Sequence, residues 1–163
     1  MDYDSNTVFS YHDAMILYCI QSRRKGVSIS VILGFQDMVD RTYSEWEDLD
    51  LALRRLIAID LIAINNGRFL PTPLLLNWKK REMEKTHYIY DGVKQLETQL
   101  NAYSAKVVLD SIPLPKQILN ESSYDHALTQ YLQSHKRSTR IFIGGIILVG
   151  IAIVVMISIY LFK

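Results

Sequence analysis

Residues 51–72, LALRRLIAIDLIAINNGRFLPT, contain the change of pattern that decides the fold. The first half places Leu53 and Leu56 on one face of a helix. After Ile59 the helical spacing gives way to a short apolar run, then Asn66-Gly67, then Arg-Phe-Leu. Asn-Gly supplies the two positive φ angles of a tight hairpin turn. The sequence therefore predicts a helix followed by a two-stranded β-hairpin.

Three amphipathic helices are predicted before this hairpin. The first begins with a capping box of Ser10 and Asp13, in which each residue bonds the other's backbone. The second begins at Ser28 or Ser30 and ends near Asp40, and apolar side chains recur at helical spacing within it. The third begins at Ser44, with Glu47 completing a second capping box. Three helices and then a hairpin make up residues 8–72.

This order is that of a winged helix-turn-helix domain. The phrase LALRRLIAIDLIAINNGRFLPT resembles one common in such domains, in which an ALxRL helix meets a small-residue turn, an apolar strand and a G-R-F-x-x-T wing exit. Asp60 stands where those sequences usually have glycine, and aspartate tolerates the left-handed conformation. Similarity to PadR-like and MarR-like regulators implies DNA binding, with the third helix in the major groove and the wing beside it.

The charge of the third helix disfavours DNA as a partner. A helix that reads a groove needs cations to neutralise phosphates, whereas the start of this helix carries four acids, and residues 8–72 hold seven basic against eight acidic residues. Four arginines could still form a DNA surface if they converged on one face. The sequence favours a protein partner and leaves DNA open. The predicted contact residues for either partner are Arg41, Glu45, Trp46, Glu47, Asp48, Arg54, Arg55 and Arg68.

A long helix is predicted over residues 73–110, with Thr72 as its cap and Pro73 at its first position. Two interpretations of its second half stay open: an amphipathic helix that covers its own domain, or a homodimer helix, as PadR-like proteins often have after the wing. The apolar positions there follow the spacing of a coiled-coil seam. The predicted dimer seam consists of Val93, Leu96, Leu100, Tyr103 and Val107.

A single transmembrane helix is predicted at residues 141–162. This segment carries no charge, and at about 1.5 Å per residue it is long enough to span a hydrocarbon core of about 30 Å. Basic residues are more frequent before it than after it, so the positive-inside rule places the preceding domain in the cytoplasm, at the cell membrane. Residues 111–135 are predicted to be a spacer and a short helix capped by Ser122 and Asp125.

Neither catalysis nor a cofactor or metal is predicted. The histidines fall on different predicted elements, and the only cysteine, Cys19, lies in an apolar run typical of a buried core. Asp48 and Asp50 are assigned to a solvated helix surface. The net charge of +1 gives no global field towards nucleic acid or lipid.

The predicted fold is mainly α, with a winged helix, further helices and one C-terminal transmembrane helix. The predicted function is a membrane-tethered, non-enzymatic interaction or regulatory module with a protein partner. The alternative is a membrane-bound, DNA-binding transcriptional regulator. A third hypothesis, an apolar-ligand sensor with its pocket between the first helix and the long helix, has no specific residue in its support.

Overall fold

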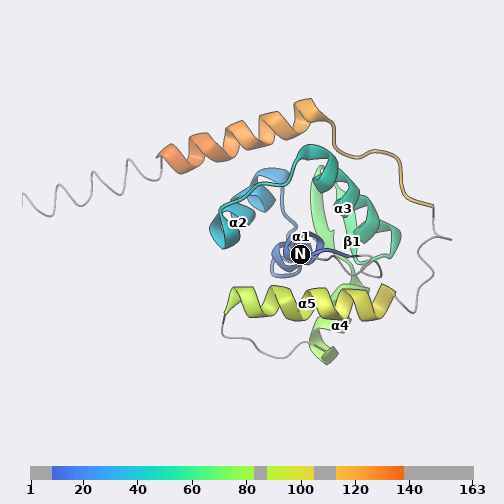
Figure 1. Cartoon of the computed structure of the whole chain (residues 1–163). Coiled ribbons are helices and arrows are strands. Elements are labelled where there is room, and N and C mark those ends of the chain that lie inside the picture. Colours follow the sequence, from blue (N-terminus) through green and yellow to red (C-terminus); the bar gives the residue numbers. More distant parts are fainter. Residues whose placement is uncertain (1–8, 83–87, 105–112, 138–163) are drawn as a thin grey trace, which may run out of the picture. The chain divides into compact units, whose positions relative to one another are not determined.

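The computed structural model describes residues 9–82, 88–104 and 113–137. In these residues there are six helices and one two-stranded hairpin, and the hairpin follows the first three helices (Figure 1). The fold is therefore mainly α with a winged-helix-like arrangement, as the sequence predicted. The chain divides into two units, Met1–Leu128 and Thr129–Lys163. The described part of the second unit, residues 129–137, is helical.

The elements follow one another without long connections up to the end of the hairpin. They are α1 (Tyr11–Gln21), α2 (Ile29–Asp40), α3 (Trp46–Ala58), β1 (Ile62–Asn65), β2 (Arg68–Pro71), α4 (Pro73–Glu82) and α5 (Ile89–Ser104). Residues 113–120 have no regular secondary structure, and a last helix covers residues 121–137. None of the helices among the described residues is long and apolar enough to cross a bilayer. The predicted span at residues 141–162 lies outside the described residues.

The helix caps confirm one prediction and correct two. Ser10 and Asp13 form the predicted capping box at α1. Ser44 does not cap α3, because its Oγ accepts a hydrogen bond from Gln36 Nε2 at 2.6 Å and Glu45 takes the cap position.

The last helix is also capped two residues earlier than predicted. Asn120 Oδ1 accepts hydrogen bonds from the backbone N–H and the Oγ of Ser123, both at 2.8 Å. These bonds make Asn120 the cap in place of Ser122, because the amide of Ser123 is the one an N-cap side chain reaches. Spacing alone therefore did not identify either cap residue.

The hairpin has the predicted turn. Asn65 pairs with Arg68, and Asn66 and Gly67 between them have φ values of 50° and 69°. Asp60, before the first strand, has φ 57°, the left-handed conformation expected of the residue that replaces glycine there.

The hairpin is fixed to the segment before α2. Phe69 exchanges two backbone hydrogen bonds with Val27, of 2.8 and 2.9 Å. A third short extended segment therefore supports the wing, and the hairpin does not depend on its own two strands alone.

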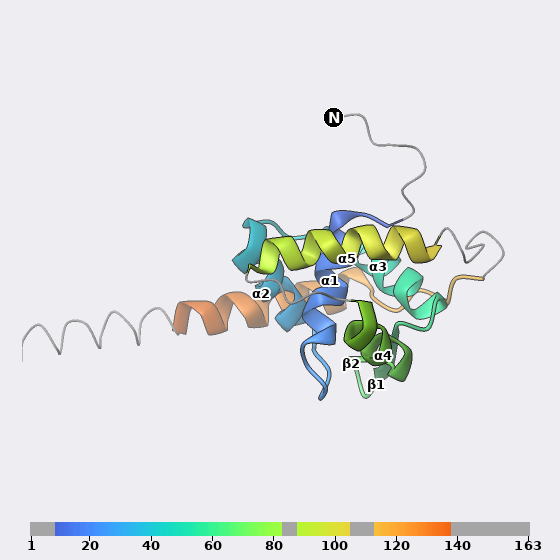
Figure 2. The ribbon, with the colours of Figure 1, turned by 90° about the horizontal axis from the view of Figure 1, so that it is seen from below.

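The core is built around α1. Its buried residues include Ala14, Met15, Ile16, Leu17 and Ile20, which point to several sides of the helix. The elements α2, α3, α5 and β2 all contact it. Figure 1 views α1 end-on between α3 and α5, and Figure 2 shows α5 crossing it. A helix that is apolar nearly all round is stable only when it is enclosed in this way.

The prediction of one long helix over residues 73–110 is wrong. The rings of Trp78 in α4 and Tyr103 in α5 lie 5.7 Å apart, whereas a straight helix would separate these positions by about 37 Å along its axis. The chain therefore turns back between α4 and α5, and residues 83–87 lie outside the described residues. The reversal is favoured because it brings apolar side chains of α5 onto α1.

The predicted dimer seam packs within the chain. Val93, Leu96 and Leu100 are fully buried in the core. Tyr103 packs against the same core, and Val107 lies outside the described residues. The buried side chains agree with the first interpretation, in which this helix covers its own domain.

Cys19 is buried, as predicted, and burial raises the pKa of its thiol to about 11. The folded protein therefore favours the protonated thiol. Its contribution to stability is complete below the pKa of the unfolded chain and is lost as the pH rises towards 11. We predict that iodoacetamide at pH 8 modifies the native intact chain only as fast as it unfolds, because the thiolate is the reactive form. Mass spectrometry with and without urea measures this. Rapid modification of the native protein would contradict it.

Gly26 and Gly67 form a matched pair for testing the wing's attachment. Both have positive φ, but a Cβ at Gly26 would lie 3.0 Å from the carbonyl oxygen of Phe69, whereas Gly67 has open space around it. We predict that Gly67→Ala lowers the free energy of unfolding by about 1 kcal/mol through backbone strain, and that Gly26→Ala lowers it by a further 1 to 3 kcal/mol, roughly, through overlap. Urea unfolding of the intact chain, followed by tryptophan fluorescence, measures both. Equal effects would contradict the attachment.

Candidate interaction surface on α3

The predicted contact residues occupy α3, its N-terminal approach and the wing. They differ in exposure: Trp46, Arg54 and Arg55 are half-buried, and the exposed residues are Arg41, Glu45, Glu47, Asp48 and Arg68. The acids Glu45, Glu47 and Asp48 therefore dominate the accessible start of the helix. Acidic side chains here favour the positive end of the helix dipole, and they also make the same end repel phosphate.

Asp50 was predicted to lie on a solvated helix surface, and this prediction is wrong because the side chain is buried. Its side chain is 3% exposed, and Oδ1 accepts hydrogen bonds of 2.8 Å from the backbone N–H groups of both Ile118 and Leu119. Its Oδ2 lies 2.8 Å from Nε of Arg54, one helical turn later. A buried carboxylate needs such partners, because an unpaired buried charge is costly. Asp50 thus fixes the chain around residues 118 and 119 to the side of α3.

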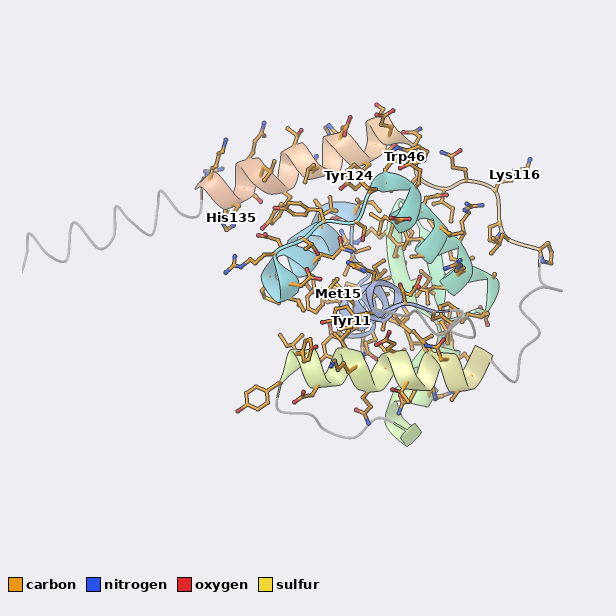
Figure 3. All side chains as sticks on the ribbon, in the orientation of Figure 1. Tyr11, Met15, Trp46, Lys116, Tyr124 and His135 are labelled. Carbon is orange, nitrogen blue, oxygen red and sulfur yellow. The ribbon has the colours of Figure 1, made fainter. Side chains whose placement is uncertain are left out.

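Residues 117–128, here called the covering segment, lie along α3 and the residues just before it. The hydroxyl of Tyr124 donates a 2.7 Å hydrogen bond to the carbonyl oxygen of Ser44. Leu119, Tyr124 and Ala127 are buried as part of the core. Figure 3 shows Tyr124 directed from this segment towards the start of α3, near Trp46. One flank of α3 is therefore covered by the chain itself.

Burial and neighbouring charge both act on the Tyr124 phenol. Burial raises the pKa of this group, and the carboxylates of Glu45 and Asp125 add to the rise. The phenol therefore stays protonated through the physiological range, and it keeps the hydrogen that it donates to Ser44.

Three of the four predicted arginines have partners in the chain. Arg54 pairs with Asp50. Arg55 Nη1 lies 3.9 Å from Oδ2 of Asp13, and its side chain is 34% exposed. Arg68 donates from Nε and Nη2 to the carbonyl oxygens of Lys25 and Gly26, at 3.2 and 2.7 Å. Arg68 thus holds the wing to the turn after α1, and a DNA phosphate would have to compete with that contact.

A cleft of about 560 Å³ opens between the first turn of α1, the approach to α3 and the face of α3 that the covering segment leaves uncovered. The apolar-ligand hypothesis placed a pocket elsewhere, between the first helix and the long helix. The residues that line the cleft are Ser10, His12, Asp13, Ile16, Thr42, Tyr43, Ser44, Glu45, Asp48, Leu51, Ala52 and Arg55.

Sequence reasoning missed Asp50, Tyr124 and the role of Asp13 in the cleft. The spacing of Asp50 and Arg54, one turn apart, was a signal for an ion pair. Nothing local to either residue indicated burial, because the groups that enclose Asp50 come from residues 118 and 119. Asp13 was identified as a cap, and its position opposite Arg55 depends on how α1 packs against α3.

Comparison with known proteins adds no relative. No family model matches the chain, and searches of curated proteins and of solved structures found no match either. The winged-helix-like arrangement consequently rests on the order and geometry of the elements.

Asp50 and Asp48 form a matched pair for testing the covering segment. We predict that Asp50→Ala lowers the free energy of unfolding by about 2 to 4 kcal/mol, because two amides and Arg54 lose a buried partner. Asp48→Ala, at an exposed position, should change it by no more than about 0.5 kcal/mol. Urea unfolding measures the stability, and hydrogen exchange at the amides of Ile118 and Leu119 reports the release. Unchanged exchange in Asp50→Ala would contradict the anchoring role.

Proposed function

We propose that this protein is a membrane-tethered winged-helix protein that acts as a non-enzymatic interaction module on the cytoplasmic face of the cell membrane. The supporting observation is the state of α3. One flank carries the covering segment, held by Asp50 and Tyr124, and the exposed start is acidic at Glu45, Glu47 and Asp48. A surface of this kind suits a protein partner better than a polyanion.

The membrane part of the proposal rests on the composition of residues 141–162. An uncharged apolar segment of this length favours a bilayer. The covering segment ends close to it in sequence, so anchorage would hold the α3 surface near the membrane. The partners of such a module would be proteins that are present at that surface.

The alternative, a membrane-bound transcriptional regulator, needs cations free to meet phosphates. Arg54 and Arg68 are engaged with Asp50 and with the carbonyls of Lys25 and Gly26. Residues 8–72 also carry more acids than bases. These features weigh against duplex binding without a conformational change around α3.

We predict that the intact chain stays in the membrane fraction after alkaline carbonate extraction, and that a chain without residues 141–162 does not. Proteins that copurify with the intact chain after cross-linking should be lost from the double charge reversal Glu47→Lys with Asp48→Lys. The matched control is Glu121→Lys with Asp125→Lys, which makes the same change at two exposed positions of the last helix. Quantitative mass spectrometry compares the partners that copurify with the unchanged protein and with the two charge-reversed proteins.

Two results would contradict the proposal. One is equal retention of partners by both charge-reversed proteins, which would remove α3 from the interaction. The other is salt-sensitive duplex binding with a dissociation constant of about 10 nM or below, the range of specific DNA-binding proteins. In the second case Arg55→Ala and Arg41→Ala would test the regulator, because Arg41 is exposed and the Arg55 side chain is 34% exposed.

A further inference from the structure

The cleft beside α3 carries more negative than positive charge. Three carboxylates line it, those of Asp13, Glu45 and Asp48, against one guanidinium, that of Arg55. His12 also lines it and has its own acidic neighbour, Asp40, at 3.9 Å. Whether or not His12 is protonated, the acids outnumber the cations, and the cleft attracts a positive group.

Asp13 provides an unused acceptor in this cleft. Its side chain is only 3% exposed. Its Oδ2 accepts hydrogen bonds from the backbone N–H and the Oγ of Ser10, at 2.7 and 2.8 Å. Among the described residues no hydrogen-bond donor reaches Oδ1, and the 3.9 Å between Oδ2 and Arg55 Nη1 is longer than a hydrogen bond. Oδ1 keeps contact with solvent, so a cationic donor from a ligand can reach it.

The rest of the cleft suits a long side chain with an apolar stem. Ile16, Leu51 and Ala52 give it an apolar portion, and the polar lining comes from the start of α1, the residues just before α3 and α3 itself. Its volume of about 560 Å³ is in the range of pockets that enclose ligands. Lysine and arginine side chains combine a hydrocarbon stem with a cationic head, and they bury the stem while the head keeps polar partners.

We propose that this cleft binds a lysine or arginine side chain of a protein partner, with the cationic head donating to Asp13 between Glu45 and Asp48. The stem lies along Ile16 and Leu51. This inference rests on the proposed interaction function and specifies the chemistry of the partner: a basic segment. Phosphate-bearing ligands, including anionic lipid headgroups, are disfavoured because the same three carboxylates repel them.

The test uses the intact protein in detergent micelles and a fluorescently labelled peptide, Ala-Ala-Arg-Lys-Arg-Ala-Ala, followed by fluorescence anisotropy. We expect Glu45→Gln and Asp48→Asn each to weaken binding by about fivefold or more, as loss of a close charge partner does. Glu47→Gln is the matched control. It removes one exposed carboxylate from the same helix turn, but its side chain does not line the cleft, so binding should change by less than about twofold.

A second peptide tests the cationic head itself. Citrulline in place of arginine and norleucine in place of lysine keep the stem and remove the charge. We expect this peptide to show no measurable binding. Asp13 is not substituted first, because its carboxylate also closes the capping box of α1 and a loss of binding could reflect unfolding.

Two results would overturn the inference: no binding of the basic peptide, or equal weakening by Glu45→Gln, Asp48→Asn and Glu47→Gln. Equal weakening would mean a diffuse attraction to the acidic helix start. Either failure is distinguishable from failure of the proposed function. If only the inference fails, partners still copurify with the intact chain and are lost from the Glu47→Lys, Asp48→Lys protein.

Discussion

The need to enclose α1 governs the rest of the fold. Met15, Ile16, Leu17 and Ile20 are buried on several sides of one helix, so no single neighbour can cover it. Helices α2 and α3 and the wing cover part of its surface, and α5 covers another part. The hydrophobic effect is proportional to the apolar area removed from water, and the return of the chain after α4 adds the face that the winged-helix-like part leaves open. The same demand buries the positions that resemble a dimer seam.

A second, polar constraint decides what α3 can contact. Asp50 is enclosed and needs donors, and it takes them from Arg54 and from the backbone of residues 118 and 119. Tyr124 adds a buried hydrogen bond to the approach of the helix. Together they occupy one flank of α3. The opposite side of α3 faces the cleft that contains Asp13. The helix therefore presents an acidic start and a cleft that attracts cations, whereas a DNA-reading helix presents basic side chains.

These two constraints bear on each other at Arg55. Packing of α3 on α1 brings this guanidinium opposite Asp13, at a distance that is close enough for attraction and too long for a hydrogen bond. The contact neutralises part of the buried charge and leaves one carboxylate oxygen open to a ligand. A basic side chain from a partner would therefore complete an electrostatic arrangement that the chain itself fills only in part.

Much of the first 72 residues was determined by the sequence itself, because the signals there are local. The Ser10–Asp13 box, the left-handed Asp60 and the Asn66-Gly67 turn depend on a few neighbouring residues, and each prediction was confirmed. Only the tertiary structure decided the rest. The reversal between α4 and α5 and the burial of Asp50 depend on partners distant in the sequence. The displaced cap at Ser44 depends on Gln36, a residue of the preceding helix. Helical periodicity identifies an apolar or polar face, and it does not specify which segment of the chain will cover that face.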